Sequence, residues 1–131
     1  IGGKRMQTLL TVALGGALGA LGRYGAVGLI NEVLGKQFPY ATLAVNVLGS
    51  FLIGVAYVFV VEKFHTLPEF RALVMVGFLG AFTTFSTFSL ETVGLLDEGR
   101  VMAAGAYILS SVILCLMATF SGILIAKPMI S

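Results

Sequence analysis

Five hydroxyl side chains fall within seven consecutive residues of this chain, 83–89, and two phenylalanines stand among them. Hydroxyl groups donate hydrogen bonds, and the edge of an aromatic ring is electropositive. Together they suit a small anion that has shed water, because they attract it without the full positive charge that would bind it too tightly to leave. The sequence here reads Thr83, Thr84, Phe85, Ser86, Thr87, Phe88, Ser89.

An ordinary structural explanation of the same segment stays open. The hydroxyls can bond back to the carbonyl four residues earlier, and the phenylalanines can be packing side chains. On a regular helix, phenylalanines at 82, 85 and 88 and hydroxyls at 83, 86 and 89 form neighbouring stripes of one surface. The two explanations therefore predict the same surface but different uses of its hydroxyls.

The backbone of this segment is expected to leave the regular helix. Gly77 and Gly80 precede the adjacent threonines at 83 and 84, and all four residues have low helix propensity. Non-helical backbone at membrane depth persists only where it is buried in protein or lines a wet cavity. Its freed carbonyls then resemble the ion ligands of discontinuous transporter helices.

Further polar side chains stand in apolar surroundings. Asn46 is the amide within its apolar run. It can serve either as a hydrogen-bond donor to an ion or in a hydrogen bond between helices. A polar stripe with one residue every four positions is formed by Tyr107, Ser111, Cys115 and Thr119. It can be a path for an ion, or its side chains can form hydrogen bonds between helices.

Two ionisable residues lie within or near the ends of apolar runs. Arg23 and Glu91 are functional candidates, because charges at membrane depth are energetically expensive. Snorkelling of the side chain to the membrane interface explains either residue equally well.

The composition requires membrane elements to position these groups. The chain has 131 residues, of which 58% are hydrophobic and 11% charged, against about 25% charged in soluble domains. A water-soluble enzyme is therefore excluded. Charge-free runs cover 6–22, 37–61, 72–90 and 101–126, and about 20 residues cross a bilayer.

These runs predict a single all-α domain, 1–131, with transmembrane helices at about 7–30, 41–61, 70–96 and 101–126 and short loops. The net charge of +2 is dispersed, which argues against a nucleic-acid partner. The one cysteine excludes disulfide scaffolds and multi-cysteine metal sites.

Glycines at helical spacing indicate close helix packing. The first helix carries Gly15, Gly16, Gly19, Gly22, Gly25 and Gly28, and the second carries Gly49 and Gly54. A phosphate-binding loop is rejected, because this spacing is not the dinucleotide pattern and follows no strand.

The charge distribution specifies the orientation only weakly. An even number of spans places both termini on one side of the membrane. Five Lys or Arg residues fall on that side and two on the other, so the positive-inside rule favours cytoplasmic termini.

The chain resembles the Fluc (CrcB) family of fluoride channels. The resemblance is carried by Gly15-Gly16-x-x-Gly19-Ala20-x-x-Arg23-Tyr24, by Thr42-Leu43-x-Val45-Asn46-x-x-Gly49, and by Gly77-Phe78-Leu79-Gly80 leading into Thr83-Thr84-Phe85-Ser86-Thr87-Phe88-Ser89-x-Glu91. It extends to the fourth helix through Tyr107, Ser111 and Thr119. Cys115 departs from the serine that the resemblance leads us to expect.

This resemblance implies an antiparallel, dual-topology homodimer in the inner (plasma) membrane, in which two pores passively export fluoride. One structural sodium ion is implied at the dimer interface. The implied pore residues are Phe85, Phe88, Asn46, Ser86, Thr87, Tyr107, Ser111 and Thr119. The implied vestibule residues are Arg23 and Glu91, and the implied sodium ligands are the carbonyls of Gly80 and Thr83.

Two other functions agree with part of the sequence. Small multidrug exporters, which couple cation export to protons, share this length and span number, but they need a carboxylate within the first helix. The predicted first helix, 7–30, has none, and Glu91 belongs to the third. A noncatalytic assembly subunit fits the glycines but leaves the hydroxyl and phenylalanine segment unexplained.

Overall fold

The computed structural model describes residues 2–63 and 68–130, and in these ranges all regular structure is helical. Four helices are long and apolar enough to cross a membrane: Gly2–Leu34, Tyr40–Val60, Pro68–Asp97 and Val101–Ile130. The expected all-α, four-span membrane architecture is therefore confirmed.

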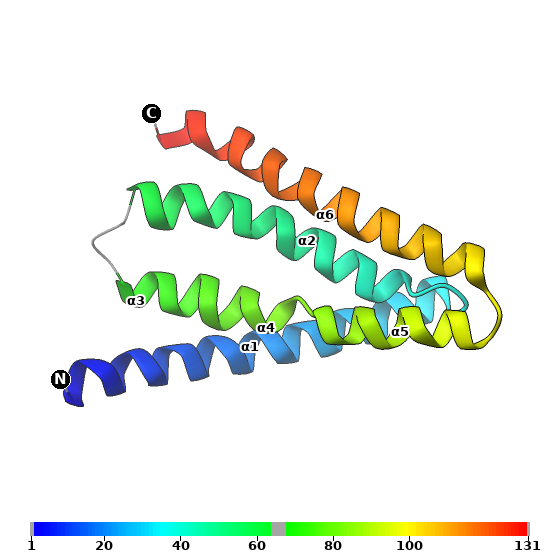
Figure 1. Ribbon diagram of the computed structural model, residues 1–131. Helices are drawn as coiled ribbons and strands as arrows, with labels where there is room; N and C mark the ends of the chain where they lie inside the picture. The colour runs from blue at the N-terminus through cyan, green and yellow to red at the C-terminus, as the bar shows by residue number, and fades with distance from the viewer. Residues whose placement is uncertain (1, 64–67, 131) are drawn as a thin grey trace.

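The helices form an elongated antiparallel bundle (Figure 1). The first long helix is α1, Gly2–Leu34, and the last is α6, Val101–Ile130. α1 begins and α6 ends at the same end of the bundle. α2, Tyr40–Ala56, packs along α6 and continues as the π-helical turns of η1, Tyr57–Lys63.

The third span is assembled from several pieces. It comprises α3, Pro68–Arg71; the π-helical η2, Ala72–Leu79; α4, Gly80–Phe82; and α5, Phe85–Asp97. η2 and α4 pack along α1, whereas α5 packs against α6. The two halves of this span therefore have different neighbours.

Two helices end later than the sequence indicates. α1 continues past residue 30 through Leu34, because polar residues are compatible with a helix and the helix ends only at Gly35. Gly35 has a φ of 80°, a conformation that closes a helix readily when the residue is glycine. α6 continues through Pro128, which removes one backbone hydrogen bond within its final turns.

Part of the glycine pattern explains the close packing of α1. A Cβ built on Gly15 would lie 2.4 Å from the Leu73 carbonyl oxygen, and one on Gly19 would lie 2.2 Å from that of Phe78. By contrast, Gly16, Gly25 and Gly28 have no neighbour within 4 Å of such a Cβ. The packing interpretation thus holds within this chain for only one side of α1.

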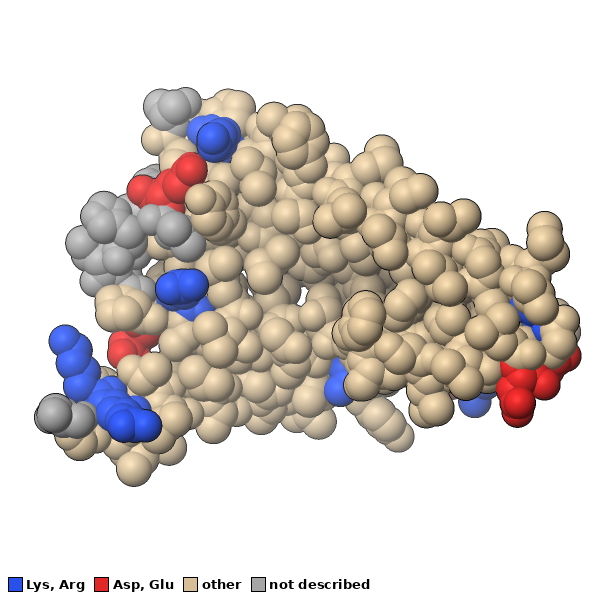
Figure 2. All heavy atoms as spheres, in the orientation of Figure 1, with Lys and Arg blue, Asp and Glu red and all other residues tan. Residues whose placement is uncertain are grey.

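The outer surface is apolar. Large hydrophobic side chains stand exposed along the spans, including Leu21, Met102 and Phe120. Charged atoms gather at the two ends of the bundle, with a surface between them that is almost free of charge (Figure 2). This distribution suits burial in lipid rather than in water.

Candidate anion site

The backbone between α4 and α5 is extended at two residues. Thr83 has φ −89° and ψ 160°, and Thr84 has φ −151° and ψ 121°. The Thr84 hydroxyl accepts a hydrogen bond from the backbone N–H of Thr87 at 3.2 Å and so caps the N-terminus of α5. Regular helix therefore stops after Phe82 and starts again at Phe85.

Asn46 of α2 holds this extended backbone. Its side-chain amide donates to the Thr84 carbonyl oxygen at 2.9 Å, and its amide oxygen accepts from the Thr84 backbone N–H at 2.7 Å. The backbone N–H and carbonyl of Thr84 are thus both satisfied by the Asn46 side chain. The Asn46 amide retains one further N–H, since one of its two is committed to Thr84.

The interruption removes the usual helical donors from two carbonyl groups. In a regular helix the Gly80 carbonyl accepts from the N–H of residue 84, but that N–H donates to Asn46. The Thr83 carbonyl would accept from the N–H of residue 87, but that N–H donates to the Thr84 hydroxyl. These are the two carbonyls that the sequence resemblance implies as sodium ligands.

A cavity of about 350 Å³ lies beside the interruption. Four of the predicted pore residues line it: Asn46, Phe85, Phe88 and Ser111. The two phenylalanine rings are tilted by 46° with centroids 5.3 Å apart, and Phe85 is 77% exposed. The remaining lining residues are Ser50, Thr83, Thr84, Val112, Cys115 and Leu116, so its described wall holds no charged side chain.

The Ser111 hydroxyl is the unusual group of this cavity. Ser111 is only 7% exposed, and its Oγ has no hydrogen-bond partner among the residues that the structure describes. A buried polar atom without a partner is energetically unfavourable, and such atoms point to an ion or water that completes them.

Three predicted pore hydroxyls bond to the protein instead of lining the cavity. Thr119 donates to the Ser50 carbonyl oxygen at 2.8 Å and ties α6 to α2, which is the interhelical role left open for it. Thr87 accepts from the Thr84 hydroxyl at 3.0 Å. Ser86 lies exposed in the first turn of α5, with its Oγ 3.5 Å from that of Thr84.

Tyr107 lies behind the cavity wall. It is fully buried, and its hydroxyl donates to Glu91 at 2.9 Å. Its ring packs against Phe88 with centroids 5.0 Å apart, and edge-on against Phe38 at 5.5 Å. Tyr107 therefore supports one of the two cavity phenylalanines.

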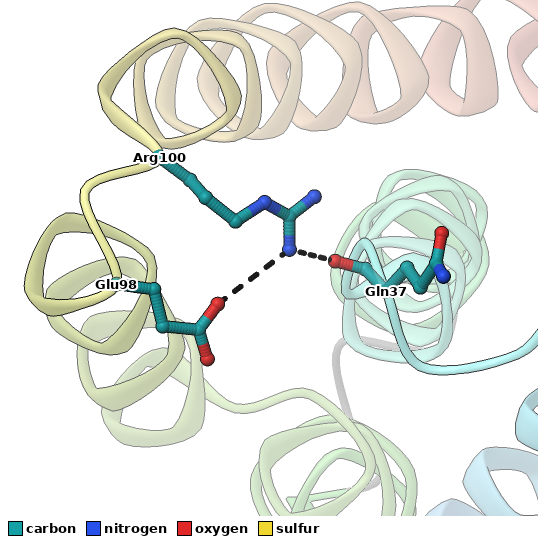
Figure 3. Close-up of polar contacts among 3 residues, drawn as sticks. All are labelled: Gln37, Glu98 and Arg100. Carbon is teal, nitrogen blue, oxygen red and sulfur yellow. Dashed lines mark hydrogen bonds and ion pairs between the residues drawn. The ribbon is translucent and has the colours of Figure 1, made fainter.

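Glu91 lines a second cavity, of about 360 Å³, at the loop end of the bundle. Arg100 also lines it, pairs with Glu98 at 3.7 Å and donates to the Gln37 carbonyl oxygen (Figure 3). These contacts join the loop before α6 to the loop before α2. Tyr107, which bonds Glu91 and packs on Phe88, stands between the two cavities.

Arg23 of α1 also contacts the interrupted span. Its Nε donates to the Ala81 carbonyl oxygen at 3.0 Å, in the last turn before the extended residues. A positive charge is favourable at the C-terminal end of a helix, where carbonyls lack partners.

The predicted continuous stripe of phenylalanines is wrong at Phe82. Phe82 precedes the extended residues, is 7% exposed and stacks on Phe78 with centroids 5.9 Å apart. A three-residue repeat places side chains on one surface only if the helix is unbroken. Local back-bonding does occur for Thr83, which donates to the Leu79 carbonyl, and for Ser89, which donates to that of Phe85.

Two residues of this site are not among the predicted pore residues. Thr84 supplies the helix cap and the backbone that Asn46 holds, and Ser50 lines the cavity. Threonine is among the residues favoured at the N-cap of a helix, and this preference could have identified Thr84 as the cap before Phe85. Nothing in the local sequence singles out Ser50.

The described residues contain no group of three or more His, Cys, Asp or Glu side chains that could hold a metal.

Residues 10–123 match the family model described as "CrcB-like protein, Camphor Resistance (CrcB)". Curated relatives named "Fluoride-specific ion channel FluC" are also similar. The protein of Hahella chejuensis is 58% identical over 91% of this chain and 94% of its own length. That of Geobacter sp. (strain M21) is 47% identical over 95% of this chain and all of its own length.

A relative of the same name from Methylococcus capsulatus is 48% identical over 92% of this chain but only 53% of its own length. The family match thus covers most of the chain and includes the interrupted span, Asn46 and the cavity side of α6. The chain belongs to the CrcB family.

Proposed function

We propose that this protein is a fluoride-selective ion channel. One observation carries the proposal: a cavity that combines two phenylalanine rings, the Asn46 amide and the unpartnered Ser111 hydroxyl, with no charged side chain in its described wall. The names of the similar proteins, fluoride-specific ion channels, support the same ion.

The groups in the cavity suit weak, multiple contacts with an anion. The electropositive edges of Phe85 and Phe88 and the hydrogen-bond donors Ser111 and Asn46 replace part of the water that fluoride sheds. No single contact carries a full charge, so the ion enters favourably and still leaves. No bond is made or broken in this process, and the protein is therefore not an enzyme.

The path from the loop end would pass Glu91 and Tyr107 before it reaches Phe88. Arg23, on the other side of the interruption, would supply positive potential in an aqueous vestibule. Ser86 and Thr87, in the first turn of α5, would extend the polar path beyond the cavity. Thr119, whose hydroxyl donates to the Ser50 carbonyl, would support the path by holding α6 to α2.

We further propose that two copies associate antiparallel in the inner membrane and form two separate pores. The cavity is open on its outer side, where Phe85 is 77% exposed, so a second subunit could complete its wall. The uneven but small bias of Lys and Arg between the two ends suits insertion in both orientations. Each pore would release fluoride from the cytoplasm down its electrochemical gradient.

A structural sodium ion fits the interruption. The Gly80 and Thr83 carbonyls lack their helical donors, and Gly80 is exposed on the bundle surface. Freed carbonyls of interrupted helices are suitable ligands for Na⁺. Two carbonyls from each subunit would hold the ion between the subunits, where it would tie the two interrupted spans together.

Ion efflux from reconstituted liposomes tests the channel function. Liposomes that contain the protein should release fluoride far faster than protein-free liposomes, while their chloride release stays near that of the protein-free control. A fluoride-sensitive electrode and a chloride electrode measure the two rates. Fluoride release no faster than from protein-free liposomes would refute the proposal.

Sodium replacement tests the proposed cation. Exchange of Na⁺ for N-methylglucamine should lower the thermal unfolding temperature of the purified dimer, because the link between the carbonyls is lost. Replacement of K⁺ in a sodium-containing buffer is the matched control and should have no such effect. An unfolding temperature independent of Na⁺ would contradict the site.

The multidrug-exporter alternative is not favoured. α1 does include one acidic residue, Glu32, but it is exposed in the last turn of the helix and not within its apolar part. Glu91, which lines the loop-end cavity, belongs to α5 and is bonded to Tyr107.

A further inference from the structure

We infer that Cys115 makes the cavity beside the helix interruption a binding site for soft, thiol-seeking metal ions, and that a metal bound there closes the anion pathway. The closure, though not the metal binding, rests on the proposed channel function. The inference begins from the contents of the cavity wall on α6.

Cys115 is a free cysteine, partly exposed, and it lines the cavity together with Ser111, which lies four residues earlier. Residues four apart lie on the same face of a helix, so the thiol and the hydroxyl face the cavity one turn apart. Asn46 and the ring pair of Phe85 and Phe88 line the same cavity. A group attached to the Cys115 sulfur would therefore share this space with them.

Ser111 is the independent sign that this space takes a ligand. Its hydroxyl is buried and unpartnered in the same cavity. A halide or water bound to a metal on Cys115 would accept the hydrogen bond that this hydroxyl has to give. The site thus offers one soft ligand and one nearby donor to complete the coordinated group.

The chemistry needs no oxidant or reductant. Soft sulfur ligands select soft metals, and mercuric chloride is a neutral molecule that can enter apolar surroundings. The Cys115 sulfur forms a bond to mercury, one mercury–chlorine bond breaks, and the thiol proton and a chloride ion leave. The product is a linear sulfur–mercury–chlorine group beside Ser111.

Mercuric chloride is the probe for the experiment. We expect it to lower the initial rate of fluoride efflux from proteoliposomes by roughly tenfold, because a bulky group stands in a constriction that a small ion must pass. Dithiothreitol should restore the rate. The Cys115→Ser variant, normalised to its own untreated rate, should not respond to mercury.

A second variant tests whether mercury must bind in the cavity to lower fluoride efflux, or whether binding elsewhere on α6 is enough. Ile113 lies two residues from Cys115 on α6, is 51% exposed and is not among the cavity residues. Cys115→Ser combined with Ile113→Cys should bind mercury at nearly the same depth and keep its fluoride efflux. If mercury lowers the fluoride efflux of this variant as much as that of the protein with the unchanged sequence, the assignment of the block to the cavity is overturned.

The amount of mercury bound per chain, determined by mass spectrometry of the protein, gives a readout that does not depend on ion flux. One mercury at Cys115 with unchanged efflux would overturn the closure, and no mercury at Cys115 would overturn the site. If untreated liposomes release no fluoride, the channel proposal fails, and the mercury content alone decides the binding site.

Discussion

Asn46 takes the second of the two roles that its place in an apolar run left open, a donor to an ion or a hydrogen bond between helices. One N–H of its amide donates to the Thr84 carbonyl, and the amide oxygen accepts from the Thr84 N–H. The same side chain therefore shapes the backbone and retains one donor for the cavity. Any change at this position affects both functions.

Asn46→Asp is expected to abolish fluoride efflux. A carboxylate still accepts from the Thr84 N–H, but it repels the Thr84 carbonyl oxygen and any anion in the cavity. The lost hydrogen bond should also lower the free energy of unfolding by about 1–3 kcal/mol. Efflux assays and thermal unfolding measure the two effects.

Gln7→Glu makes the same chemical change at an exposed residue of α1 and serves as the control. It should leave efflux and unfolding near those of the unchanged chain. Efflux from Asn46→Asp at the unchanged rate would contradict the assigned role.

Phe85→Ile tests the contribution of the aromatic ring edge to fluoride efflux with little effect on packing. Phe85 is 77% exposed in the chain, so its replacement should hardly change the stability of the subunit. A lost aromatic contact of about 1 kcal/mol corresponds to about a fivefold slower fluoride efflux. Initial efflux rates of the two proteins, at equal reconstituted amounts, test this expectation.

Phe88→Ile should lower both efflux and stability, because the Phe88 ring also packs against Tyr107. Phe120→Ile is a control at another exposed phenylalanine, which lies on α6 outside the cavity wall. Unchanged flux in both Phe85→Ile and Phe88→Ile would end the idea that ring edges hold the anion.

At the scale of elements, the interrupted span depends on its two different neighbours. Its first half, η2 and α4, packs on α1, and its second half, α5, packs on α6. The Arg23 contact to the Ala81 carbonyl and the Asn46 contacts to Thr84 attach the interruption to α1 and α2. Because contacts from two helices hold this short segment, close helix packing is a condition for the site.

Gly19→Ala tests that dependence. The new Cβ would lie 2.2 Å from the Phe78 carbonyl oxygen, and this backbone atom cannot move aside without shifting η2. We expect the free energy of unfolding to fall by about 1–3 kcal/mol, as in other overpacked interiors. Thermal unfolding of the purified protein measures this loss.

Gly16→Ala is the matched control, because its Cβ has no neighbour within 4 Å in the chain. It should leave the subunit as stable as before, or slightly stabilise it through the higher helix propensity of alanine. Equal effects of the two substitutions would contradict the packing of α1 on η2.

At the scale of the whole molecule, the surface is that of a membrane protein. The bundle exposes large apolar side chains along its length, and its charges lie at the ends (Figure 2). A Cβ on Gly25 or Gly28 of α1 would have no neighbour within 4 Å among the described residues, so these glycines add small-residue surface at which a second copy could approach closely.

Dual topology can be tested by labelling. Gly3 is exposed at the start of α1, at the end of the bundle where α6 also ends. In a Cys115→Ser background, Gly3→Cys should react with an impermeant thiol reagent in about half of the copies in intact spheroplasts, because the charge bias is weak. The fraction of copies that carry the reagent is measured from the increase in protein mass by mass spectrometry.

Labelling of detergent-solubilised membranes provides the full signal for comparison. Reaction of nearly all copies, or of nearly none, in sealed spheroplasts would show a single orientation and contradict the antiparallel dimer.

The predictable part of the fold was the number and approximate place of the spans, because long charge-free runs must be shielded from water whatever their packing. The ends of α1 and α6 were less predictable, since the polar residues after residue 30 and Pro128 do not by themselves stop a helix. The stripe through Phe82 was wrong because periodicity presumes an unbroken helix, and the backbone is extended at Thr83 and Thr84.

By itself, the sequence determined the membrane class, the set of hydroxyl and aromatic side chains, and the family, because these depend on composition and on local order of residues. The tertiary structure decided which donors are already bound. Thr119 meets a carbonyl 69 residues away and Asn46 one 38 residues away, while the Ser111 hydroxyl meets none. Such pairings depend on how helices pack against one another, which no local pattern along the chain records.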